Sequence, residues 1–215
     1  FLEDLKTVSK DSQNKGWFIG SIYTSKRSAQ SSVLNLLDGQ QRITTIYLIG
    51  REIMNIRYYF DDDELENLEN DDELEDLEND ENTNPPKTFD LEELSAATRT
   101  RYKSLCRDIS ECLYNSEEPR FETETDSNEF LEKYLKPREF DNYSKYVEWY
   151  KEIKRITEED RSDFSETKIT LSKNISDIRK FIKDIISDND LNEAFEQIIN
   201  MGDSLINKLF LIEIP

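Results

Sequence analysis

The segment between Asp61 and Glu81 contains fourteen acidic residues and no basic residue. Most of it is a tandem nine-residue repeat, DDELENLEN followed by DDELEDLEN. Nine residues turn an α-helix through about 900°, so the leucines of the two repeats would lie on opposite sides of one helix. No continuous apolar face forms, and the carboxylates repel one another. The sequence therefore predicts a disordered acidic insertion over 61–88, with a calcium site or a nucleic-acid mimic as alternatives that the spacing does not favour.

The rest of the chain is only mildly acidic. The net charge is −20 over 215 residues and the acidic segment accounts for −14, which leaves −6 for the remainder. This balance neither supports nor excludes a nucleic-acid surface. The densest basic cluster is Arg99, Arg101, Lys103 and Arg107. Because acids flank it on both sides, we expect an ordinary solvated helix face.

Cysteine and histidine content limits metal and redox chemistry. Cys106 and Cys112 are six residues apart in a helical pattern, so they point in different directions and form no disulfide. The chain has no histidine, which excludes a Cys/His zinc site. We expect both cysteines to be small core residues in the reducing cytoplasm. No apolar run approaches about 20 residues and no signal peptide is recognisable, so we expect neither a membrane span nor secretion.

Hydrophobic patterning predicts an α+β chain that is mostly helical. Strands are expected where aromatic and β-branched residues gather, at 15–25, 33–37 and 209–214. Helices are expected where apolar residues recur every three or four positions. These helices are 40–58, 91–114, 128–135, 143–156, a long helix around 171–185, 191–200 and 204–208.

The order of these elements predicts a small sheet built from both ends of the chain, with a large helical insertion between them. We assign a core with the turn motif to 1–60, the acidic insertion to 61–88, a helical subdomain to 89–208 and a returning core strand to 209–215. The apolar run LFLIEI ends close to the last residue and needs neighbouring strands. We therefore expect the chain to be a piece of a longer protein.

The residues DGQQR, 38–42, join the second strand to the first long helix. One interpretation is purely structural: Asp38 is the helix N-cap, Gln41 completes a capping box, and Gly39 relaxes the turn. That interpretation leaves Arg42 and Thr44 without a role.

A second interpretation is a phosphate site. A helix that begins at a glycine turn presents free N–H groups of Gly39 and Gln40 and the positive end of its dipole to an anion. Arg42 can grip phosphate oxygens bidentately. Asp38 can hold a metal ion between phosphates, and Gln40 or Gln41 can orient an attacking water.

The motif DGQQRITT and the upstream strand WFIGSI together resemble a known family. Phe18, Gly20 and Ser21 match a Phe-Leu-Gly-Ser strand, and residues 38–45 match Asp-Gly-Gln-Gln-Arg-Leu-Thr-Thr. This arrangement resembles the DGQQR-containing N-terminal domain of GmrSD-type type IV restriction enzymes. The clear resemblance spans residues 1–56.

The resemblance implies a ParB/sulfiredoxin-like core that binds and hydrolyses a nucleoside triphosphate with Mg²⁺, coupled to restriction of modified phage DNA. Ser21 and Thr44 are expected to lie near the nucleotide. The family's nuclease is a separate His-Asn-His domain or subunit, and a chain without histidine cannot supply it. Two other hypotheses stay open: a non-hydrolysing sensor of modified DNA or of a partner nuclease, and a domain that itself cuts DNA.

Overall fold

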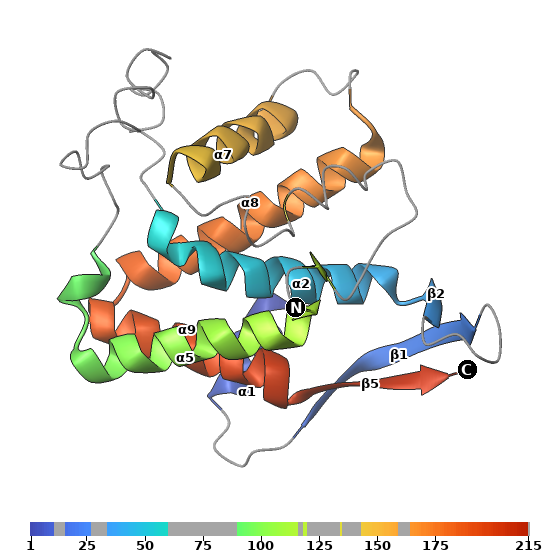
Figure 1. Ribbon diagram of the computed structural model, residues 1–215, viewed down its shortest axis with the longest axis horizontal. Helices are drawn as coiled ribbons and strands as arrows, with labels where there is room; N and C mark the ends of the chain where they lie inside the picture. Colours follow the sequence, from blue (N-terminus) through green and yellow to red (C-terminus); the bar gives the residue numbers. More distant parts are fainter. Residues whose placement is uncertain are drawn as a thin grey trace.

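The computed structural model describes residues 1–10, 16–26, 34–59, 90–115, 118–119, 134, 143–158 and 164–214 (Figure 1). The acidic insertion over 61–88 lies outside the described residues, and so does the helix expected at 128–135, apart from Tyr134.

The described part of the chain is mostly helical, as the sequence predicts. Its helices are α1 (Leu2–Ser9), α2 (Gln40–Asn55), α5 (Ala96–Leu113), α7 (Tyr143–Glu158), α8 (Glu166–Ser187) and α9 (Leu191–Asn207), with 3₁₀ turns η1 (Ile56–Tyr58) and η2 (Leu91–Glu93). Its strands are β1 (Trp17–Lys26), β2 (Leu34–Asp38) and β5 (Leu209–Ile214), and β3 (Tyr114–Asn115) and β4 (Glu118–Pro119) form a separate short pair.

The main sheet joins the two ends of the chain, which confirms that prediction. Its strand order is β2-β1-β5, with β1 antiparallel to β2 and parallel to β5. The sheet projects from one side of the helices, and β1 and β5 lie side by side along it (Figure 1). All the described helices between β2 and β5 therefore belong to one long connection.

Helix α2 occupies the centre of the helical part. The sequence predicts an apolar stripe on one face, but nine of its residues are buried, including Arg51, Glu52 and Asn55. The reason is that α2 contacts α8, α5 and α9, with α8 on one side and α5 and α9 on the other (Figure 1). A helix enclosed in this way buries residues around its whole circumference.

A buried carboxylate lies in the second half of α2. Glu52 is fully buried, and its two oxygens accept hydrogen bonds from the hydroxyls of Tyr59, at 2.8 Å, and Tyr134, at 2.7 Å. Burial raises the pKa of Glu52, while the positive charge of Arg179 opposes that rise. The carboxylate therefore depends on its partners, because an unpaired charge in this position is strongly unfavourable.

Arg179 brings the compensating charge from α8. Its side chain is buried, and Nη1 donates a hydrogen bond of 2.5 Å to the hydroxyl of Tyr146 on α7. Its guanidinium carbon lies 4.3 Å from the ring centre of Tyr59 and 4.1 Å from that of Tyr150. Aromatic faces stabilise a desolvated guanidinium through cation–π attraction. The cluster thus connects α2, the residue that follows η1, α7 and α8.

The prediction of two helices over 191–200 and 204–208 is wrong, because α9 is one helix from Leu191 to Asn207. Gly202 suggests a break, but its lack of a side chain serves helix packing instead. A Cβ at this position would lie only 2.6 Å from Cδ2 of Leu105 on α5. The glycine lets the two helices approach closely.

The two cysteines differ in environment. Cys106 is half-buried against the core, and burial raises the pKa of its thiol to about 11. Cys112 is exposed, so the prediction that it belongs to the core is wrong. The buried face of α5 is made by Leu105, Ile109 and Leu113, and position 112 lies off that face. None of the described helices is long and apolar enough to cross a membrane.

Thiol labelling tests these two environments. A maleimide reagent at neutral pH should modify Cys112 rapidly and Cys106 slowly, because burial hinders access and keeps the Cys106 thiol protonated. Cys112→Ser should remove the fast phase, whereas Cys106→Ser should leave it. Mass spectrometry of the labelled peptides measures both rates, and equal rates in the folded protein would contradict the assigned burial.

The buried charge cluster makes a stability prediction. Glu52→Leu should lower the free energy of unfolding by roughly 3 kcal/mol or more, because two tyrosine hydroxyls lose their buried acceptor and the buried Arg179 loses an opposite charge. Glu52→Leu combined with Arg179→Met should recover much of that loss, since replacing buried opposite charges together by apolar residues is often tolerated. Urea unfolding of the wild type and both variants measures the differences. A double variant less stable than Glu52→Leu alone would refute the proposed coupling.

Candidate functional site

The DGQQR residues form the predicted strand–turn–helix junction. Asp38 is the last residue of β2, and α2 begins at Gln40. Asp38 pairs with Tyr23 across the antiparallel β1–β2 ladder, so this end of the turn is fixed by the sheet. The junction therefore stands between β1 and the first turn of α2.

The capping-box interpretation is wrong. The N-cap of α2 is Gly39, and no described side chain hydrogen-bonds to the helix N-terminus as a cap. The Asp38 carboxylate instead accepts a hydrogen bond of 2.7 Å from the N–H of the next residue, Gly39. Asp38 belongs to the ladder and stands one position too early to reach the N–H groups that a cap satisfies.

Gly39 is required at the junction for two reasons. Its φ of +93° lies in the left-handed region, where residues with a side chain are strained. It is also buried, and a Cβ would lie 2.6 Å from Cγ2 of Ile22 on β1. The missing side chain therefore lets the turn pack directly on the first strand.

Arg42 connects the turn to the first strand by its side chain. Its backbone N–H donates to the Gly39 carbonyl at 3.1 Å, and its Nη1 donates to the Ser21 carbonyl on β1 at 2.9 Å. The contact brings together the two sequence motifs, which are 21 residues apart. Ser21 contributes its main-chain oxygen to this contact. An arginine has five N–H donors, so a single bond leaves donors for a ligand.

The predicted site residues differ in how exposed they are to solvent. Asp38, Gln40, Gln41 and Arg42 are all exposed and share the junction. The Gln41 carbonyl accepts a hydrogen bond of 2.8 Å from the Thr45 hydroxyl, which leaves the amide side chain unconstrained by that bond. Thr44 is only 8% exposed, so it does not join the surface group.

Tyr23 is a further residue at the junction, which no sequence motif indicates. It lies directly opposite Asp38 in the β1–β2 pairing, and its side chain is 45% exposed. Side chains of directly paired residues lie on the same face of a sheet. An exposed aromatic residue is therefore paired with Asp38, next to the register shift between Tyr23 and Thr24. In the sequence Tyr23 is only one of the aromatic residues of the strand expected at 15–25.

Metal binding at this junction would rest on Asp38 alone. Among the described residues, no three His, Cys, Asp or Glu side chains converge on one point. Mg²⁺ commonly uses one or two carboxylates and takes its remaining ligands from phosphate oxygens and water. The donor set therefore fits Mg²⁺ that arrives with a nucleotide, and it does not fit a tightly held resident ion.

A neighbouring cleft has a different chemistry. Thr45 lines it together with residues of α1 and α8, including Asp177, Lys180 and Asp184. Two aspartates beside one lysine do not favour a polyphosphate. The exposed Arg42 gives the junction a charge that suits a phosphate better than this cleft does.

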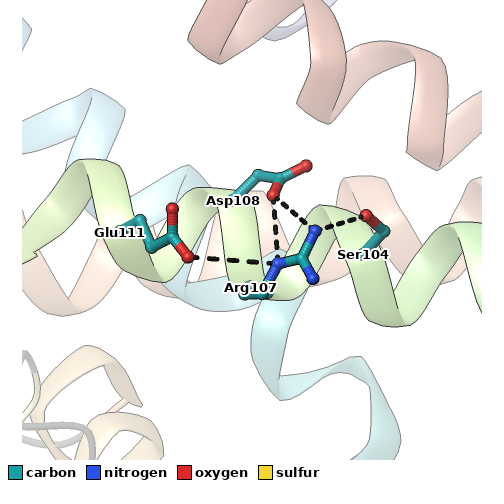
Figure 2. Close-up of polar contacts among 4 residues, drawn as sticks. All are labelled: Ser104, Arg107, Asp108 and Glu111. Carbon is teal, nitrogen blue, oxygen red and sulfur yellow. Dashed lines mark hydrogen bonds and ion pairs between the residues drawn. The ribbon is translucent and has the colours of Figure 1, made fainter.

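The basic cluster on α5 is a solvated helix face, as predicted. Arg107 contacts Asp108 at 3.3 Å, Ser104 at 3.2 Å and Glu111 at 4.0 Å (Figure 2). Arg99 is paired with Glu92, and Arg101 with Glu196. Because acids neutralise these arginines, α5 does not present a strongly positive surface to nucleic acid.

Gly39 yields a testable consequence. Gly39→Ala should lower the free energy of unfolding by about 1–3 kcal/mol, because it strains the left-handed backbone and adds a methyl group against Ile22. Combining it with Ile22→Ala removes the steric part of that effect. The loss caused by Gly39→Ala should therefore be smaller in the Ile22→Ala background than in the wild type. Denaturant unfolding of the four proteins measures both losses, and equal losses would contradict the packing of Gly39 on Ile22.

A search of the curated proteins and a search of the solved structures found no match. A family model described as "GmrSD restriction endonuclease, N-terminal domain" matches residues 1–213. The match covers nearly all of the 215 residues, from α1 to β5. The chain therefore belongs to the family of GmrSD restriction endonuclease N-terminal domains.

Proposed function

We propose that this chain is the nucleotide-binding part of a restriction system, and that the β2–α2 junction holds the phosphates of a nucleoside triphosphate. One observation carries the proposal: the exposed Arg42 is held beside a helix N-terminus by a hydrogen bond to the first strand. A cation fixed at the positive end of a helix dipole suits a polyanion. Family membership adds the context of restriction.

In this proposal the junction divides the work of binding between backbone and side chains. Of the two backbone N–H groups expected to hold phosphate, that of Gln40 begins α2 and points along the helix axis toward the phosphates, whereas that of Gly39 donates to the Asp38 carboxylate. Arg42 adds charge-assisted hydrogen bonds from the donors that Ser21 does not use. Ser21 and Thr44 keep a supporting role, Ser21 through its carbonyl and Thr44 from inside the helix packing.

Hydrolysis requires a metal and an oriented water. Asp38 would hold Mg²⁺ jointly with the phosphates, and the ion would neutralise charge that develops on the transferred phosphoryl group. The exposed amides of Gln40 and Gln41 stand on the first turn of α2, where one of them can position the attacking water. Hydrolysis would occur within a larger assembly that includes a His-Asn-His nuclease domain or subunit and modified phage DNA. The proposal also includes a ParB/sulfiredoxin-like fold for the core of the chain.

A non-hydrolysing sensor is the second candidate function, and one observation favours it. The Asp38 carboxylate already accepts the N–H of Gly39, and it belongs to no group of three or more metal-ligating side chains among the described residues. Such a junction can bind phosphate without activating water strongly. Nucleotide binding would then report on modified DNA or on a partner nuclease, with no turnover of its own.

Substitutions at the junction separate these functions. In the full protein, Arg42→Ala should weaken nucleotide binding by about tenfold to a hundredfold, which corresponds to the loss of one or two charge-assisted hydrogen bonds. Arg42→Lys should fall between, because lysine keeps the charge and lacks the planar fork. Asp38→Asn should abolish the Mg²⁺-dependent gain in affinity and stop hydrolysis. Calorimetry with a non-hydrolysable nucleotide and a phosphate-release assay measure the two quantities.

Arg107→Ala is the matched control, since it removes another exposed arginine, one that is paired with acids on α5. It should leave binding and turnover unchanged. A wild type that binds nucleotide tightly without phosphate release would favour the sensor over the hydrolase. A wild type that binds no nucleotide would refute both versions.

A further inference from the structure

Gly20, in the middle of β1, has a backbone conformation that other residues rarely adopt. Its φ is +128°, far outside the range of ordinary strand residues. The parallel register of β1 with β5 shifts between Phe18 and Ser21, on either side of this glycine. A register shift of this kind twists a strand locally and re-aims the groups beside it.

The group beside Gly20 is the guanidinium of Arg42. A Cβ built on Gly20 would lie 3.0 Å from Arg42 Nε and 3.1 Å from its Cζ. These distances are shorter than ordinary van der Waals contacts between such atoms. The planar end of Arg42 therefore rests on the bare Cα of Gly20, while its Nη1 bonds to the carbonyl of the following residue, Ser21.

We propose that Gly20 is a positioning residue, whose missing side chain forms the seat that holds the Arg42 guanidinium ready for phosphate. The proposal deepens the function proposed above and, for its effect on ligand affinity, rests on it. Gly20 does not touch the ligand. It acts through Arg42, by letting the guanidinium pack closely against the strand, where one donor is anchored and the others stay available.

The physical gain is a lower entropy cost of binding. A free arginine side chain loses up to about 2 kcal/mol of rotamer entropy when a ligand immobilises it. An arginine already seated on Gly20 and bonded to Ser21 has lost part of that freedom before the ligand arrives. A methyl group at position 20 would displace the guanidinium, because the end of a side chain moves more easily than a strand.

The experiment combines nucleotide affinity with the motion of Arg42. Four full-length proteins are compared: wild type, Gly20→Ala, Arg42→Ala and the double variant. Gly20→Ala should weaken binding of a non-hydrolysable nucleotide about tenfold, a loss that matches one hydrogen bond to a charged group. The same change in the Arg42→Ala background should cause no further loss. Backbone strain at position 20 is present in both backgrounds, so it cannot account for the difference.

A second readout needs no nucleotide. The Nε–H group of Arg42 gives an NMR signal that Arg42→Lys removes, which assigns it. Its order parameter should be in the rigid range in the wild type and fall below about 0.6 in Gly20→Ala. Gly202→Ala is the control for general destabilisation, because its Cβ would meet Leu105 in the helical core. That variant should leave the Arg42 signal unchanged.

The outcomes distinguish the two proposals. A wild type without nucleotide affinity would refute the proposed function, and the NMR comparison would still decide the role of Gly20. An Arg42 side chain that stays rigid in Gly20→Ala would overturn the positioning role. Equal losses of affinity from Gly20→Ala in the wild type and in the Arg42→Ala background would overturn it as well.

Discussion

The burial of the Glu52 carboxylate is the constraint on which the helical part of the molecule depends. A charged group enclosed on all sides is tolerated only if its partners come with it. Those partners are the hydroxyls of Tyr59 and Tyr134 and the positive charge of Arg179, and they arrive from separate parts of the chain. The need of one carboxylate for hydrogen bonds and an opposite charge therefore fixes the relative orientation of α2 and α8. Apolar packing alone would fix that orientation less strictly.

The other end of α2 is specified by close backbone approach. Gly39 packs against Ile22, and Arg42 lies over Gly20, so each side of the contact between the turn and β1 has a glycine where the other has a side chain. The carbonyl of Ser21 then adds one directional bond to Arg42. Helix α2 is thus anchored to the sheet at its first turn and to the helical core in its second half. A site on its first turn inherits the rigidity of both.

Local hydrophobic periodicity predicted most of the strands and helices. It did not predict burial that depends on tertiary contacts. The strands around Trp17, Leu34 and Leu209 and the helix that begins at Gln40 follow from patterns within ten or twenty residues. The single-stripe description of α2 failed, because Arg51 and Glu52 are buried by neighbours distant in sequence. Local patterns treat charged residues as solvated, and only long-range partners such as Tyr134 overturn that expectation.

The candidate site was also predictable only in part. The motif identified the residues of the junction, and the strand–turn–helix context is as expected. The cap was misassigned because Asp38 and Gly39 both suit an N-cap, and the sheet pairing of Asp38 with Tyr23 decided between them. The contact of Arg42 with Gly20 and Ser21 joins residues about twenty positions apart. No local sequence pattern predicts such a contact. The only indication in the sequence is Gly20, a glycine inside a predicted strand.

The two anchors of α2 also determine how binding of a ligand at the junction could displace the other helices. In the proposed function, a phosphate bound to Arg42 acts on a helix whose far end holds a fully buried, hydrogen-bonded carboxylate. Bending the helix or letting its second half slip would expose or unpair Glu52, at a cost of several kcal/mol. Moving α2 as one body together with α8 keeps the Glu52 cluster intact. Communication from the junction to the helices should therefore be a rigid displacement of packed helices, which is one of the common forms of conformational switching.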